Sequence, residues 1–246
     1  MGAAGRAFGL ILGLALGSAA RAEPPAIAAA SDLQFVLPAL AADFGRALNP
    51  TLGSSGMLAR QIARGAPFQL LLSADDSHAR FAVESGRAEG PPRDYARGRL
   101  ALVVARNAAI ALDPTLASLG RELAARGGAK FAIANPEHAP YGRAAVEALS
   151  GAGLWPALRS RLVLGENVAQ AARFVQSGAA AAGLVALAVA RGAGLEHAAL
   201  PASMHGALRQ QVVVVKGAGA DARAFADYLV SDRARAILTA NGFDPP

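Results

Sequence analysis

Two segments of the chain place serines directly before predicted helices, beside residues that let the backbone turn sharply. Ser31 follows the apolar run 26–30, and Ser55 belongs to the Gly-Ser-Ser-Gly segment 53–56. The first turn of a helix offers N–H groups without intrahelical partners and a partial positive charge, and serine adds a hydroxyl donor there. Flanking glycines let the backbone curl around an anion. The combination suits a small oxyanion, although each serine taken alone also fits an ordinary helix cap.

The other polar residues form no recognisable catalytic or metal-binding pattern. The chain has no cysteine, no GxSxG nucleophile elbow and no glycine-rich phosphate loop with lysine. Asp75 and Asp76 follow a predicted strand, where an aspartate commonly forms a turn or a cap. The histidines lie far apart, without the spacing of metal ligands, at His78, His138, His197 and His205. We therefore expect a binding protein that needs no cofactor, rather than an enzyme.

The N-terminal segment has the composition of a secretory signal peptide. Arg6 precedes an apolar run over residues 7–20, which is shorter than the roughly 20 residues that span a bilayer. Residues 20–22 match the small-x-small pattern of a signal peptidase site, so we expect cleavage after Ala22. Because no cysteine is available to carry a lipid anchor, we expect a soluble periplasmic protein.

The formal net charge is +6 at pH 7, and arginine supplies most of the positive charge. The arginines are dispersed along the chain and no aromatic stripe accompanies them, so the sequence does not favour nucleic acid as a partner. The positive charge could draw anions toward the surface, although a general bias toward arginine and alanine explains it equally well.

Short apolar runs alternate with stretches of helical periodicity along the mature chain. The predicted strands cover residues 26–30, 69–73, 99–105, 131–134, 162–164, 181–185 and 211–215. The predicted helices cover residues 32–48, 57–64, 75–85, 116–125, 141–149, 168–176, 222–229 and 232–240. This alternation with short connections is typical of an α/β fold with mostly parallel sheets flanked by helices.

The number of strands favours two lobes over one sheet. Residues 106–114 are the candidate crossing segment and residues 192–208 the candidate return. After the signal peptide, residues 1–22, we expect a first lobe built from residues 23–105 and 209–246, and a second from residues 106–208. Both serines then lie at the carboxyl ends of strands in the first lobe, where ligands of α/β proteins bind.

Several segments resemble the molybdate-binding periplasmic proteins of ABC transporters. They are AAASDL (28–33), GSSGMLARQIARGAPFQLLLSAD (53–75), GRLALVV (98–104), ANPEHAPYGRAAVEAL (134–149), GLV (183–185) and YLVSDRARAILTANGF (228–243). They occur in the family's order and span nearly the whole mature chain, so their combination is much more specific than any one motif.

The resemblance implies a two-lobed binding protein that closes on molybdate, and also on tungstate, which has the same shape and charge. It implies that Ser31 and Ser55 bind oxyanion oxygens, and that backbone N–H groups at Tyr141 and Val168 complete the site from the second lobe. The only metal is then the centre of the oxyanion, which no protein atom ligates. The implied partner is the membrane permease of an ABC transporter, and we expect a monomer.

One position departs from the family pattern. Some members carry a tyrosine after the Gly-x-Val strand, and its hydroxyl completes the site, whereas this chain has Ala186 there. Tyr141 stands where such members have a small residue, and we hypothesise that it compensates by its position or its hydroxyl. Three alternatives stay open: a receptor for another oxyanion such as sulfate, an oxyanion sensor or scavenger without a dedicated permease, and an enzyme.

Overall fold

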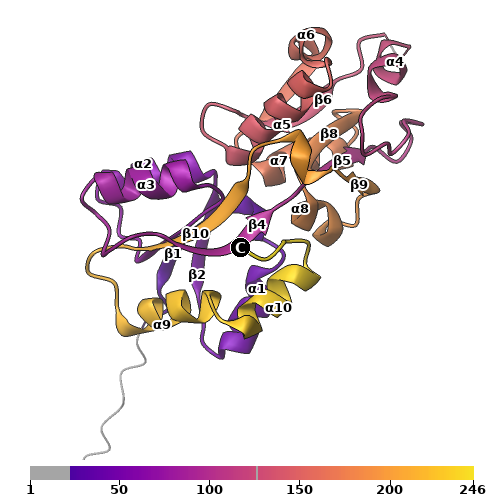
Figure 1. Ribbon diagram of the computed structural model, residues 1–246. Helices are drawn as coiled ribbons and strands as arrows, with labels where there is room; N and C mark the ends of the chain where they lie inside the picture. Colours follow the sequence, from indigo (N-terminus) through magenta and orange to yellow (C-terminus); the bar gives the residue numbers. More distant parts are fainter. Residues whose placement is uncertain (1–22, 126) are drawn as a thin grey trace, which may run out of the picture.

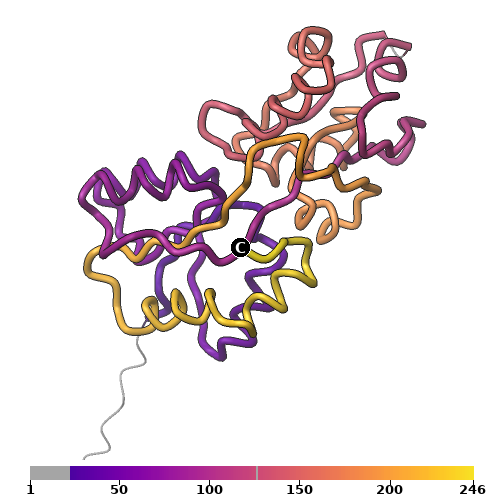
Figure 2. The backbone as a smooth tube through the Cα atoms, in the orientation of Figure 1, coloured from indigo at the N-terminus to yellow at the C-terminus, as the bar shows by residue number. Residues whose placement is uncertain are grey.

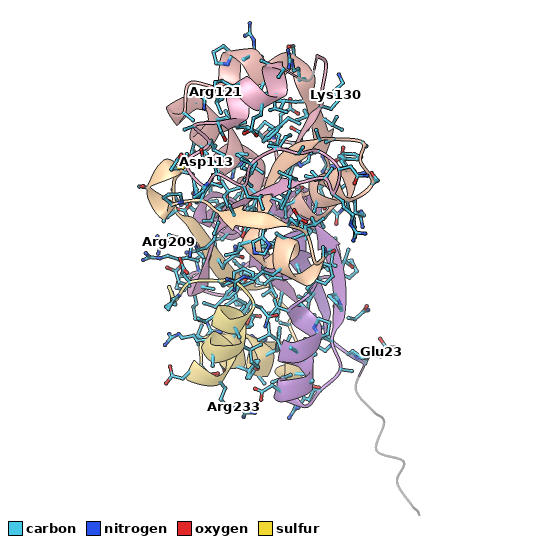
Figure 3. The ribbon with its side chains drawn as sticks, turned by 90° about the vertical axis from the view of Figure 1, so that its right-hand side faces the viewer. Glu23, Asp113, Arg121, Lys130, Arg209 and Arg233 are labelled. Atoms are coloured by element: carbon cyan, nitrogen blue, oxygen red, sulfur yellow. The ribbon has the colours of Figure 1, made fainter. Side chains whose placement is uncertain are left out.

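The computed structural model describes residues 23–125 and 127–246, and these fold into two lobes, each built on a five-stranded sheet (Figure 1). The predicted signal peptide, residues 1–22, lies outside the described residues. Seen from the side, the molecule is elongated, with Glu23 and Arg233 toward one end and Arg121 and Lys130 toward the other (Figure 3). No helix in the described part of the chain has both the length and the apolar character needed to cross a bilayer.

The sheet of the first lobe has the strand order β2-β1-β3-β10-β4. Its strands are β1 (Ala26–Ala30), β2 (Asn49–Gly53), β3 (Leu70–Ser73), β4 (Arg93–Gly98) and β10 (Leu208–Val214). Its helices are α1 (Leu37–Phe44), α2 (Ser55–Ala63), α3 (Asp76–Glu84), α9 (Ala220–Leu229) and α10 (Asp232–Ala240), and a 3₁₀ turn spans Ser31–Leu33.

The two faces of this sheet bury alternate residues of the same strands. Leu70 and Leu72 pack into one core with Phe225 of α9, while Leu71 packs into a second core with Ile62 of α2. Successive side chains of a strand point to opposite faces, so a continuous apolar run such as that of β3 requires cover on both sides. Helices α2 and α3 cover one face, and α1, α9 and α10 cover the other (Figure 1).

The sheet of the second lobe has the order β7-β6-β8-β5-β9. Its strands are β5 (Leu100–Val104), β6 (Phe131–Ala134), β7 (Leu162–Gly165), β8 (Ala182–Ala186) and β9 (His197–Ala199). Its helices are α4 (Leu119–Ala124), α5 (Pro140–Gly151), α6 (Trp155–Leu158), α7 (Val168–Gln176) and α8 (Leu187–Gly192), with 3₁₀ turns at Arg159–Arg161 and Ala202–Met204.

The chain passes between the lobes twice, and the first crossing differs from the prediction. Strand β5 pairs with β8 and β9, so the crossing is at Arg99, between β4 and β5, and not at residues 106–114. The first lobe therefore ends near residue 98 instead of 105. The apolar sequence of β5 fits the buried position of either sheet, so its pattern does not reveal its lobe. The return lies between β9 and β10, within the predicted residues 192–208.

The two crossing segments run side by side (Figure 2). Gly98 is in register with Leu208, and Leu200 donates a backbone hydrogen bond to Leu100 at 2.9 Å.

Both sheets are mixed, where mostly parallel sheets were expected. In each, two strand pairs are parallel and two are antiparallel, because β10 and β5 run against their neighbours. A chain that enters and leaves a lobe through adjacent strands must reverse the direction of one of them.

The predicted helix 32–48 is interrupted, and α1 begins at Leu37 with Pro38 in its first turn.

Candidate functional site

A small cavity lies between the lobes, where several strands end. In the first lobe it is reached by the residues that follow β1, β2 and β3. These three strands are parallel neighbours, so their carboxyl ends meet at one edge of the sheet. In the second lobe the first turns of α5 and α7 face it. The lining residues are Ala30, Ser31, Asp32, Gly53, Ser54, Ser55, Ala74, Ala139, Pro140, Tyr141 and Val168.

Ser31 opens the 3₁₀ turn after β1 and is 3% exposed. Its hydroxyl oxygen accepts a hydrogen bond from the backbone N–H of Ala169, in the first turn of α7, at 3.4 Å. The side chain therefore bridges the two lobes. The predicted helix 32–48 begins as this short turn and becomes an α-helix only at Leu37, but the position of the serine at the end of a buried strand is as expected.

Ser55 is the first residue of α2 and is fully buried. Its hydroxyl oxygen accepts from the backbone N–H of Ala74, which directly follows β3, at 2.9 Å. The residue that takes the cap position is Ser54, yet its side chain makes no cap hydrogen bond to α2. Both serines of the pair line the cavity, and the cap position of α2 is not closed by a side-chain hydrogen bond.

The second lobe presents two helix starts. Tyr141 follows Pro140 in the first turn of α5, and Val168 is the first residue of α7. Both line the cavity and are almost fully buried. The structure thus brings together Ser31, Ser55, Tyr141 and Val168 around one space, with two residues from each lobe. Among the residues that the structure describes, no lysine or arginine lines this space, so donors there are neutral.

The sequence profile of bacterial extracellular solute-binding proteins matches residues 26–244. The chain belongs to this family. It is 35% identical to the molybdate-binding protein ModA of Rhodobacter capsulatus, over 96% of this chain and 94% of that protein.

Solved structures agree with this assignment. The periplasmic molybdate-binding protein of Azotobacter vinelandii superposes with a TM-score of 0.79 at 32% identity, covering 90% of this chain and 99% of that one. The sulfate-binding protein SubI of Mycobacterium tuberculosis has a TM-score of 0.67 at 15% identity, covering 90% and 86%, and shares the fold alone.

This solute-binding protein has a buried polar network behind the cavity that the sequence did not reveal. Asp32 is 1% exposed, and its Oδ2 accepts hydrogen bonds from the Tyr141 hydroxyl at 3.0 Å and from Gln210 Nε2 at 2.8 Å. The Tyr95 hydroxyl donates in turn to Gln210 Oε1 at 3.2 Å. Burial raises the pKa of the Asp32 carboxyl to about 6, against the opposing effect of the hydrogen bonds from Tyr141 and Gln210.

The network also bears on the hypothesis that Tyr141 compensates for the tyrosine that is absent at Ala186. Its hydroxyl is hydrogen-bonded to Asp32, and burial followed by the charge of Asp32 raises the pKa of that hydroxyl well above its ordinary value. Ala186 ends β8 and is fully buried, and it is not among the described residues that line the cavity. The tyrosine at the cavity therefore comes from the start of α5, and its hydroxyl reaches the first lobe.

A second set of contacts joins the lobes around Ser54. Its hydroxyl is 2.9 Å from His138 Nδ1, and the Gly56 N–H donates to the His138 carbonyl at 3.0 Å. His138 Nε2 lies 3.6 Å from Glu166, too far for a hydrogen bond, and the Glu166 side chain is 64% exposed. Ser54, His138 and Glu166 thus lie in a row in space, but they lack the close, buried hydrogen bonds that activate a nucleophilic serine.

An ion pair outside the cavity lining also links the lobes. Arg143 of α5 hydrogen-bonds to Asp75, which caps α3 and also accepts from the His78 backbone N–H at 3.1 Å. In the described residues, no group of three or more His, Cys, Asp or Glu side chains is placed to hold a metal ion. The arrangement can therefore enclose an anion but offers no cluster for a resident metal.

Replacing Ser55 with alanine should weaken anion binding. The change removes a fully buried hydroxyl from the first turn of α2, and losing one hydrogen bond to a charged group costs about 1–3 kcal/mol, or roughly 5- to 150-fold in affinity. Titration calorimetry would measure the effect. Ser177→Ala is the control, because that hydroxyl bonds to a helix end on the surface. An unchanged affinity would remove Ser55 from the site.

Replacing Gly56 with alanine should hinder closure of the lobes. A Cβ there would lie 2.7 Å from the His138 carbonyl oxygen and 2.6 Å from His78 Nε2, so the interlobe hydrogen bond at Gly56 cannot persist unchanged. We expect about fivefold weaker anion binding, since one such bond contributes about 1 kcal/mol. Gly127→Ala is the matched control, because a Cβ there meets nothing within 4 Å. Equal affinities of the two variants would contradict the role of Gly56.

Proposed function

We propose that this solute-binding protein captures molybdate outside the cytoplasm and delivers it to the membrane permease of an ABC transporter. One observation carries the proposal: serines and helix starts of both lobes line the same cavity, in a chain that is 35% identical to a molybdate-binding protein over nearly its whole length. Ser31 and Ser55 are proposed to bind the oxyanion from the first lobe, and Tyr141 and Val168 through their backbone N–H groups from the second.

The chemistry of the cavity supports a dianion held by neutral donors. An oxyanion that leaves water needs several hydrogen bonds at once, because one neutral bond returns far less than the cost of desolvation. Helix starts supply N–H groups and a partial positive charge without a full cation. Such a site permits release as well as capture, which suits a carrier. Catalysis forms no part of the proposal.

The size of the anion is proposed to set its selectivity. Tungstate has the shape and charge of molybdate, so fixed donors cannot separate the two well. Sulfate is smaller and leaves longer, weaker hydrogen bonds to donors placed for the larger ion. Titration calorimetry should therefore give tight one-to-one binding of molybdate and tungstate, with much weaker binding of sulfate and phosphate. Tight sulfate binding without molybdate binding would refute the assignment and favour a receptor for another oxyanion.

Export is proposed from the N-terminal segment. If signal peptidase cleaves after Ala22, the protein recovered from a periplasmic extract begins at Glu23. Intact-mass measurement of the extracted protein tests this directly, with a cytoplasmic extract as control. A mass that retains residues 1–22 in the periplasmic fraction would show that the segment is not removed.

Poor growth at limiting molybdate after loss of the gene would separate a transport receptor from a sensor or scavenger.

A further inference from the structure

Asp32 is a buried carboxyl that lines the cavity proposed for a dianion. Its Oδ2 accepts two hydrogen bonds from side chains, but its Oδ1 is inaccessible to solvent and makes no hydrogen bond of normal geometry among the described residues. The backbone N–H groups of Asp32 and Leu33 lie near the carboxyl and favour its charged form, but burial outweighs them. A carboxylate in this state is doubly unfavourable, because one oxygen lacks a donor and a bound dianion lies close to its negative charge. No full positive charge in the lining offsets that repulsion, since the described residues there include no lysine or arginine.

We propose that Asp32 binds the oxyanion as a neutral carboxylic acid, so that the protein takes up one proton for each dianion it encloses. The proton resides on Oδ1, and an oxygen of the anion is its acceptor. Oδ2, as the carbonyl oxygen of the neutral acid, still accepts from Tyr141 and Gln210, although more weakly than a carboxylate oxygen does. The inference rests on the proposed function, because it requires an oxyanion in this cavity.

The network couples this protonation to closure of the lobes. Asp32 and Gln210 belong to the first lobe and Tyr141 to the second, so separating the lobes breaks the hydrogen bond from Tyr141 and admits water to Asp32. The network also lies against the first crossing. A Cβ on Gly98 would be 2.2 Å from the Tyr141 hydroxyl and 2.9 Å from Gln210 Nε2. Closing the lobes is therefore the step that buries the carboxyl.

The groups around Asp32 do not offer a competing charge. Tyr141 of α5 and Tyr95 of β4 are the ionisable side chains of its network, and the pKa of each hydroxyl is raised well above its ordinary value, first by burial. Gln210 of β10 is neutral. Helices α7 and α8 also pack against the Ser31–Leu33 turn, and their only charged side chains, Arg173 and Arg191, are exposed. The carboxyl is thus the group positioned to change its charge.

The direction of the pH effect follows from this arrangement. Burial already raises the pKa of Asp32 to about 6 in the closed protein, and a neighbouring dianion raises it further. A group that is charged when the lobes are open and neutral when the anion is bound makes binding tighter at low pH. The affinity should fall as the pH rises above about 6, by up to about tenfold per pH unit for one proton.

Calorimetry with molybdate on the exported protein tests the proposal. Titrations at one pH in buffers of different ionisation enthalpy give the number of protons taken up, and we expect a value approaching one near neutral pH. Affinities between about pH 6 and about pH 9 should show the fall described above. In Asp32→Asn the uptake and the pH dependence should vanish, while the affinity at about pH 9 stays at or above that of the unaltered protein. Asp232→Asn is the control, because that side chain is 98% exposed on α10.

Each contrary result has a separate meaning. Molybdate binding with no proton uptake and no pH dependence would overturn this inference and leave the proposed function intact. Preference for phosphate, which can bring its own proton to an ionised Asp32, would overturn it too. Failure of the unaltered protein to bind molybdate at all would refute the proposed function itself. The uptake measurement uses the unaltered chain, so it decides the question even if Asp32→Asn does not fold.

Discussion

The parallel pairing of β2, β1 and β3 decides where the candidate site lies. Each of these strands ends in a turn that leads to a helix or a 3₁₀ turn, and the parallel register brings Ala30 beside Gly53 at the same edge of the sheet. Ser31 follows the end of β1 directly, and Ser55 follows the end of β2 after Ser54. In the second lobe β6 and β7 are paired in the same way, and they lead to the starts of α5 and α7. Two sheet edges therefore face one another across the cavity.

Close approach of the two edges restricts the residues that can stand between them. At Gly56 and Gly98 a side chain would meet atoms of the opposite lobe, and at Gly142 a Cβ would lie 2.3 Å from the Ala134 carbonyl oxygen beneath α5. These glycines matter for the space that they leave, since none of the three has a positive φ. Because the lobes approach closely, the Ser31 hydroxyl of the first lobe reaches the backbone N–H of Ala169 in the second lobe. Bulkier side chains between the lobes would hold these two groups apart.

The sequence carried much of this arrangement but not all of it. Ser31 could be predicted from a strand-to-helix junction and Ser55 from the Gly-Ser-Ser-Gly segment before a helix, because both patterns are local, while Tyr141 and Val168 came through the family resemblance. Their roles as anion ligands stay predictions. Strand β2 was missed because Pro50 argues against a strand interior, yet β2 is an edge strand, where proline is tolerated. The bond between Asp32 and Gln210 joins residues 178 positions apart, and no local pattern could indicate it.

The tyrosine hydroxyl near the cavity belongs to Tyr141 of α5, whereas the residue at the end of β8 is Ala186. A tyrosine after β8 would start from the second sheet, whereas Tyr141 starts from α5 and its hydroxyl already meets the first lobe at Asp32. A phenol in that place needs a strong acceptor once it is buried, and a carboxyl oxygen provides one. The hydroxyl at this cavity therefore comes from α5, and the carboxyl beside Ser31 is the acceptor that orients it.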